Sequence, residues 1–197
     1  MKTIPLNQPP PPPPGPEAAL AAIDRFRQLI SNGSWFAAVG ARLTAAELGE
    51  AASYLAALAV GRWTINPVAD WAEAKALAKG ASWDPSWQDA ERELHERLFA
   101  QARRLIVGVA LIDALDRVTE AASDAVNGAA ALVSARSGAA DPALLRVATT
   151  AATQACYQAA LALATGGNAD HPFSTKHRLF AAGRWPLGVI HGQFHVF

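Results

Sequence analysis

The sequence predicts an all-α protein: an irregular or orthogonal bundle of five to seven helices around a long central helical stretch, with a small β-like C-terminal appendage. Three observations predict this fold class. Residues 84–136 contain a single proline, at a position where a helix can begin. Shorter segments with apolar residues at helical spacing surround this stretch, and glycine or proline separates them. The last residues, 184–197, are instead rich in aromatic and β-branched side chains, which favour strands.

The central stretch begins at Asp84, a good N-cap residue, with Pro85 at the first helical position. Nothing in the next roughly 50 residues forbids a helix, and a straight helix of that length spans about 75–80 Å. A compact chain of 197 residues has a radius of gyration of about 16 Å. We therefore expect a bend or break, at Gly108 or at Asn127–Gly128. Residues 105–112 are apolar all round, and we expect them to cross the core and to be covered on every side.

Composition and charge narrow the possible classes of function. Hydrophobic residues make up 51% of the 197 residues and charged residues 17%, which is typical of one folded domain. The 17 basic and 17 acidic residues cancel, so neither nucleic acid nor a membrane is an expected partner. No apolar run reaches the roughly 18–20 residues that span a bilayer, and the first residues lack the apolar core of a signal peptide. We expect a cytoplasmic protein.

The chain opens with a proline-rich tail, residues 1–16, in which residues 9–14 are all proline. Such a run favours polyproline II and cannot join a core, so we expect the tail to be disordered. It is either a stiff spacer or a docking site for a proline-binding module. No charged residue directly flanks the six prolines to set a docking orientation, which favours the spacer. Residues 17–197 are expected to form a single helical domain.

Caps, prolines and glycines predict five further helices, with a short turn around Trp35 between the first two. The signals place these helices at about residues 16–30, 45–60, 66–80, 141–166 and 171–183. Thr44 and Glu47 form a capping box before the second of them. Asp141 followed by Pro142 repeats the start of the central stretch.

The helix that begins near residue 141 has an inner face of mostly small side chains, which lets a neighbouring backbone come close. That face consists of Leu145, Ala148, Ala152, Ala155, Ala159 and Ala162. Cys156 lies near it, and we expect an inert, buried thiol. Residues 184–197 are expected to form a hairpin or strand pair around His191–Gly192. Because the chain ends on Val196 and Phe197, we expect this segment to dock on the helices.

Four of the five histidines lie near the C-terminus, where they would suit a metal or acid–base site: His171, His177, His191 and His195. No helical pair of histidine with histidine or glutamate is present in this segment. We therefore interpret these histidines as polar caps on an aromatic segment, and expect no metal and no cofactor.

Two further polar groups lie on the central stretch. Glu91 and His95 are four residues apart and could touch, but they fall within a charged run, so we expect them to face solvent. A row of carboxylates in the second half would suit a divalent cation, and it consists of Asp113, Asp116, Glu120 and Asp124. Arg117 lies in the same row, opposite the apolar face, so we interpret this row as a solvated surface.

Motifs for catalysis are absent from the sequence: there is no nucleophile elbow, phosphate-binding loop or dinucleotide fingerprint. A single cysteine also excludes an intrachain disulfide and a cysteine-based zinc cluster. Five of the six tryptophans lie within residues 35–87, namely Trp35, Trp63, Trp71, Trp83 and Trp87. They either fill an alanine-rich core, which we favour, or line a pocket or partner surface.

These observations predict a non-catalytic helical protein-binding module, such as an adaptor, an inhibitor or an immunity-type partner, that binds another protein or a second copy of itself. The alternative is a small-molecule or metal-binding protein or enzyme, with a site where the histidine-bearing C-terminal segment meets the tryptophan-rich helices. The candidate partner or ligand surface consists of Trp63, Trp71, Trp83, Trp87, His191 and His195.

Overall fold

The fold is an all-α bundle with a small β appendage, as the sequence predicts. The computed structural model describes residues 14–61, 63–80, 83–137 and 141–197. Most of the proline-rich tail, residues 1–13, therefore lies outside the described residues. None of the helices in the described ranges has the length and apolar character needed to cross a membrane.

The described residues form seven α-helices, a short 3₁₀ turn and three strands. The helices are α1 (Pro16–Leu29), α2 (Ala45–Leu58), α3 (Trp71–Lys79), α4 (Pro85–Leu105), α5 (Gly108–Ser137), α6 (Pro142–Ala164) and α7 (Pro172–Ala181). The 3₁₀ turn is η1 (Ile30–Asn32), and the strands are β1 (Thr64–Pro67), β2 (Pro186–Ile190) and β3 (Gln193–Val196).

The predicted starts of α2, α4 and α6 are confirmed at the level of hydrogen bonds. The Thr44 hydroxyl accepts from the backbone N–H of Glu47, whose carboxylate in turn accepts from the backbone N–H of Thr44. The carboxylates of Asp84 and Asp141 cap α4 and α6 by accepting from backbone N–H groups of the first turn, and each helix has a proline at its first position. These starts depend on residues within one turn of each other, which explains why the sequence reveals them.

The long central stretch breaks, as predicted, directly before Gly108. Ile106 is extended, with φ −122° and ψ 136°, so α4 ends there and α5 begins at Gly108 and continues through Gly128. The expectation that residues 105–112 are covered on every side is wrong. Val107 and Val109 are 79% and 80% exposed, because the break turns this segment into an outer corner of the bundle.

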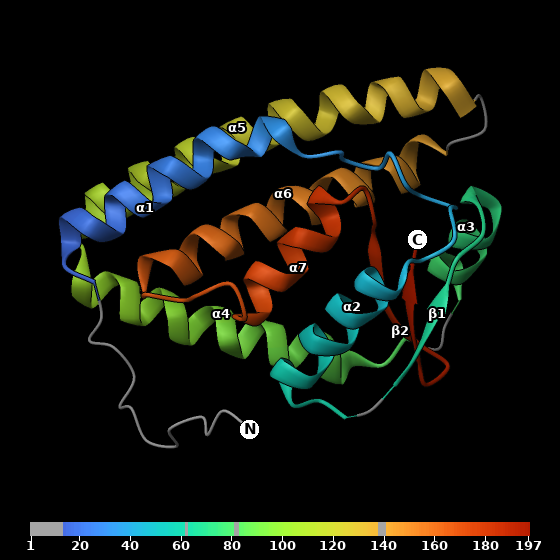
Figure 1. The fold of residues 1–197 in the computed structure, drawn as a ribbon, viewed down its shortest axis with the longest axis horizontal. Coiled ribbons are helices and arrows are strands. Elements are labelled where there is room, and N and C mark those ends of the chain that lie inside the picture. Colours follow the sequence, from blue (N-terminus) through green and yellow to red (C-terminus); the bar gives the residue numbers. More distant parts are fainter. Residues whose placement is uncertain (1–13, 62, 81–82, 138–140) are drawn as a thin grey trace, which may run out of the picture.

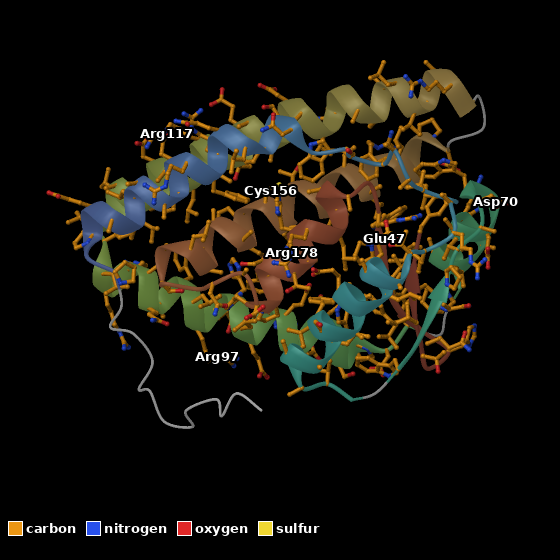
Figure 2. All side chains as sticks on the ribbon, in the orientation of Figure 1. Glu47, Asp70, Arg97, Arg117, Cys156 and Arg178 are labelled. Atoms are coloured by element: carbon orange, nitrogen blue, oxygen red, sulfur yellow. The ribbon has the colours of Figure 1, made fainter. Side chains whose placement is uncertain are left out.

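The helices pack in a bundle with α6 at its centre (Figure 1). Helices α1 and α5 run side by side along one edge, and α6 packs against both. Helix α4 contacts α6 as well, while α7 packs between α6 and α2. The small inner face of α6 is fully buried at Ala148, Ala152 and Ala155. Figure 2 shows Cys156 on the same helix, well inside the bundle.

The three strands form a sheet at the end of the molecule opposite the α4–α5 corner (Figure 1). Their order is β1–β3–β2, with β1 parallel and β2 antiparallel to β3. The predicted hairpin turns at His191 and Gly192, both with positive φ, as a two-residue hairpin turn requires.

The sequence predicts a helix start at Asn66–Pro67 and does not predict strand β1. That prediction is wrong: Asn66 and Pro67 pair with His195 and Val196 of β3. The helix begins later, at Trp71, with Asp70 as its cap. A strand partner more than 120 residues away in the chain decides the local conformation here, and Pro67 is tolerated because β1 lies at the sheet edge.

The C-terminal segment is held against the helices by backbone and side-chain bonds. The backbones of Trp185 and Phe197 exchange two hydrogen bonds. Arg184 is buried and donates to the carbonyl oxygens of Ala38, Ala41 and Arg42. It also pairs with Glu47, and this guanidinium lowers the pKa of the Glu47 carboxyl to about 2.

Candidate functional site

A buried ion pair lies where α4, α6 and α7 meet. Glu91 of α4 is only 8% exposed, so the expectation that it faces solvent is wrong. The Lys176 ammonium of α7 lies 2.6 Å from Glu91 Oε1 and 2.7 Å from Oε2. Lys176 of α7 supplies the opposite charge that makes the burial of Glu91 tolerable, although the charged sequence of α4 marks this position as solvent-facing.

Three more side chains complete a hydrogen-bonded network around this pair. The Trp87 indole N–H donates to the Tyr54 hydroxyl over 2.7 Å, and that hydroxyl donates to Glu91 Oε1. On the other side, Lys176 donates to Gln158 Oε1 over 3.1 Å. The network therefore joins α2, α4, α6 and α7, and each of these elements contributes a buried polar side chain.

The network leaves neither charge without a partner. An ammonium has three N–H donors, and Lys176 has three acceptors, two on Glu91 and one on Gln158. Its Nζ also lies 5.6 Å from the ring centre of Trp87, a cation–π distance. Burial, followed by the nearby Glu91 charge, raises the pKa of Tyr54 well above its ordinary value. Tyr54 is therefore a protonated donor at neutral pH.

A cavity of about 570 Å³ opens beside the network, between α4 and α6, and we call it the α4–α6 cavity. Its base is formed by buried side chains of both helices, of α7 and of the segment before β2: Trp87, Glu91, Leu144, Gln158, Lys176, Phe180, Trp185 and Leu187. Its mouth is formed by exposed side chains: Gln88, Arg92, Val147 and Gln154. The walls are mainly aromatic and aliphatic, with polar side chains at the base and at the mouth.

The tryptophans proposed from the sequence divide into two groups. Trp83 and Trp87 line the α4–α6 cavity, together with Trp185 from the C-terminal segment. Trp63 and Trp71 do not line it. Trp71 packs edge-on against Phe197 at 4.9 Å, and Trp63 lies partly buried over a separate apolar cluster under β3.

The C-terminal histidines are not brought together. His191 is exposed in the hairpin turn, whereas His195 is buried in β3. His171 caps α7 by accepting from the backbone N–H of Phe173, and His177 lies edge-on to the Phe26 ring at 4.8 Å. Within the described ranges, no three histidine, cysteine or acidic side chains gather in a way that would hold a metal ion.

His95 is the one histidine on the cavity wall among the described residues. Its ring stacks on Phe99 and lies 5.6 Å from the Tyr157 ring, and burial lowers its pKa. Its Nδ1 is buried and has no hydrogen-bond partner in the described part of the chain. The sequence places His95 in a charged run, but neither its contact with Tyr157 of α6 nor the cavity is visible there.

The acidic row of α5 and Cys156 lie in the environments that the sequence predicts. The acidic row of α5 is exposed, and Arg117 within it forms an ion pair with Asp113; Figure 2 shows Arg117 on the outer side of this helix. Cys156 is fully buried, and burial raises the pKa of its thiol to about 12, so it is inert at neutral pH.

Sequence reasoning missed Tyr54, Gln158 and Lys176. One signal was available: Gln158 is a large polar residue beside the small inner face of α6, where a buried polar group needs a partner. Comparisons with known protein families, with curated proteins and with solved structures found nothing that matches this chain.

Proposed function

We propose that this protein binds a small, planar and largely apolar molecule in the α4–α6 cavity. One observation carries the proposal: a cavity with aromatic walls ends on a buried polar network. Ligand sites in proteins combine an apolar lining with a few placed polar groups in this way. The volume of about 570 Å³ lies within the usual range of about 300–1,000 Å³ for such sites.

The chemistry of the network favours binding over covalent catalysis. A nucleophilic lysine needs a free amine, whereas the Lys176 ammonium is held by three acceptors. A general base needs a carboxylate oxygen within reach of substrate, whereas both oxygens of Glu91 accept from Lys176 and one also accepts from Tyr54. The pair is therefore suited to holding the base of the cavity in shape.

A cavity-filling variant tests this proposal. Ala151 lines the α4–α6 cavity, so Ala151→Phe should occupy the ligand volume, whereas Ala143→Phe adds the same ring at an exposed site on the same helix. Saturation-transfer NMR with indole and 2-naphthol should detect binding to the parent protein and to Ala143→Phe, and none to Ala151→Phe. Equal signals from both variants, or no signal from the parent, would overturn the proposal.

A protein-binding role is the second candidate, and the exposed α4–α5 corner favours it. Val107, Val109 and Ile112 are all more than half exposed, and Val109 and Ile112 lie three residues apart on one side of α5. The occupant we propose is a second copy of this chain, because a net charge of zero provides no overall repulsion between copies.

The oligomeric state tests this second role. Val109→Lys places a charge in the corner, and sedimentation velocity should show a dimer of the parent protein that this variant loses. Leu132→Lys makes the same change at an exposed site farther along α5 and should leave the dimer intact. A parent that stays monomeric at high micromolar concentration would exclude self-association through the corner.

A further inference from the structure

We infer that the ligand of the α4–α6 cavity carries a carbonyl-type oxygen, of an amide or a carboxylate, that accepts a hydrogen bond from the side-chain amide of Gln158. This inference rests on the proposed small-molecule function and specifies the chemical class of the ligand. It follows from the direction of each hydrogen bond at the base of the cavity.

The orientation of the Gln158 amide is determined by its neighbour. An ammonium only donates, so the atom of Gln158 that faces Lys176 must be the oxygen, and the NH₂ group must point the other way. Gln158 is only 2% exposed and lines the cavity. Nε2 of Gln158 forms no hydrogen bond with the described residues, and it is not one of the fully buried unpaired atoms, so it is accessible from the cavity. The NH₂ group is thus the unused polar group of the network.

The rest of the network offers a ligand no comparable acceptor. Both carboxylate oxygens of Glu91 already accept from Lys176, and the Tyr54 hydroxyl both donates to Glu91 and accepts from Trp87. Within the network a ligand donor would find no free partner, whereas a ligand acceptor meets the Gln158 NH₂ group. The Nδ1 of His95, unpaired among the described residues, also lies on the cavity wall but does not belong to the network. A ligand that accepts from the Gln158 NH₂ group gains a hydrogen bond, whereas an apolar ligand displaces water from the group and leaves it without a partner.

The charges facing the cavity disfavour a cationic ligand. Lys176 at the base pairs with Glu91, and Arg92 at the mouth pairs with Asp89 at 2.8 Å, so these charges cancel. A neutral amide therefore fits the site better than an amine, because a ligand ammonium would enter the cavity without an unpaired carboxylate among the described lining residues to receive it.

The aromatic walls specify the rest of the ligand. Trp83, Trp87 and Trp185 contribute three indole rings to one cavity, which suits a flat ring system that stacks or packs edge-on. Leu144 and Leu187 fill the space between them with aliphatic surface. The best match is a planar aromatic body with one carbonyl-bearing arm.

Four indole probes that differ only in the arm test this inference. They are indole-3-acetamide, indole-3-acetate, 3-methylindole and tryptamine, and titration calorimetry would measure their affinities for the full chain. The two carbonyl-bearing probes should bind about five- to tenfold more tightly than 3-methylindole, since each gains one hydrogen bond. Tryptamine should bind most weakly. The ratio of the affinities for indole-3-acetamide and indole-3-acetate then shows whether the site prefers a neutral or an anionic ligand.

Two variants test whether Gln158 is responsible for the preference for a carbonyl-bearing probe. Gln158→Glu keeps an acceptor for Lys176 but removes the NH₂ donor, so it should cancel the preference for indole-3-acetamide over 3-methylindole. Gln101→Glu makes the same change at an exposed site of α4 that does not line the cavity and should preserve that preference. Because Gln158→Glu places a second carboxyl near Glu91, NMR of the parent protein provides an independent measurement. The Gln158 side-chain NH₂ signals should shift with indole-3-acetamide and stay in place with 3-methylindole.

The possible failures are distinguishable. If 3-methylindole binds as tightly as the acetamide and the Gln158 signals do not move, the inferred ligand class is wrong while the cavity remains a binding site. If none of the four probes binds the parent protein, the small-molecule function itself fails. If tryptamine bound most tightly, the inference would be wrong, because the site would then favour a cationic ligand.

Discussion

At the scale of single residues, the buried ion pair between Glu91 and Lys176 is the feature with the largest expected effect on stability. Replacing Lys176 with methionine leaves the Glu91 carboxylate buried with only the Tyr54 hydroxyl as a partner. Removing one partner of a buried pair costs about 3–5 kcal/mol of unfolding free energy. Urea denaturation of Lys176→Met, followed by circular dichroism, should show a loss of this size.

A double variant separates charge from packing. Glu91→Gln combined with Lys176→Met removes both charges while keeping an acceptor for Tyr54, so it should be more stable than Lys176→Met alone. If the double variant is as unstable as the single one, the pair stabilises the fold through its shape and not through its charge compensation.

Because of His177, the free energy of unfolding should depend on pH. Burial, and then the adjacent Arg178 charge, lowers the pKa of His177 to about 4, whereas an unfolded histidine has a pKa of about 6.5. Between these values the unfolded chain binds a proton that the folded chain does not. Stability is therefore highest above pH 6.5 and falls as the pH falls towards 4, by on the order of 2–3 kcal/mol from His177.

Urea unfolding of the parent and of His177→Leu at pH 7, pH 5.5 and pH 4.5 would measure this dependence. Burial also lowers the pKa values of His95, His171 and His195, so a smaller loss of stability should remain in the variant. A variant that loses as much stability as the parent over this range would show that His177 is protonated in the folded state.

At the scale of elements, Gly188 in β2 is tightly packed whereas Gly108 at the α4–α5 corner is open, so substitutions there have opposite expected effects. Gly188 in β2 has φ +134°, and a side-chain carbon there would lie 2.8 Å from ring carbons of Trp83 and Trp87. Gly188→Ala should therefore destabilise the protein by about 1–3 kcal/mol and disturb the wall of the α4–α6 cavity. Tryptophan fluorescence would report the second effect, and denaturant midpoints the first.

Gly108 provides the matched control at the start of α5. A side-chain carbon at Gly108 meets nothing within 4 Å, and its φ is not in the left-handed region. Gly108→Ala should leave stability unchanged or raise it by up to about 1 kcal/mol, because alanine favours helix more than glycine does. A loss of stability would mean that the corner needs the freedom of glycine and is not determined by the extended Ile106 alone.

At the scale of the whole molecule, the C-terminal segment contributes a large share of the buried surface. Its fully or nearly fully buried apolar residues are Trp185, Leu187, Val189, Ile190, Phe194, Val196 and Phe197. Burying each large side chain contributes up to about 1.5–3 kcal/mol. Together they match or exceed the total stability of a typical domain, about 5–15 kcal/mol. Deleting residues 184–197 should therefore yield insoluble or molten protein.

Solubility, near-ultraviolet circular dichroism and the cooperativity of thermal melting would measure this effect. Gln193→Ala changes an exposed position of the same segment and should leave all three unchanged. A truncated chain that stays soluble and melts cooperatively would show that the helices form a complete core without the sheet.

The sequence by itself determined the fold class and most helix starts. The caps at Thr44, Asp84 and Asp141 each act within three residues along the chain, and the hairpin turn depends on adjacent residues 191 and 192. The long central stretch also had to break, because an unbroken helix of that length does not fit a bundle of this size. Features that depend on neighbouring residues, or on the length of a helix relative to the size of the protein, can be predicted from the sequence.

Only the tertiary structure determined which residues form the candidate site. Tyr54 and Glu91 are 37 residues apart, Glu91 and Lys176 are 85 apart, and the strand pairing that turns Asn66–Pro67 away from helix spans more than 120 residues. Helical periodicity assigns Glu91 to solvent because a charge alone is stable only in water. The opposing charge on α7 reverses that preference, and which helix covers which face depends on packing among all the helices, which no local pattern in the chain encodes.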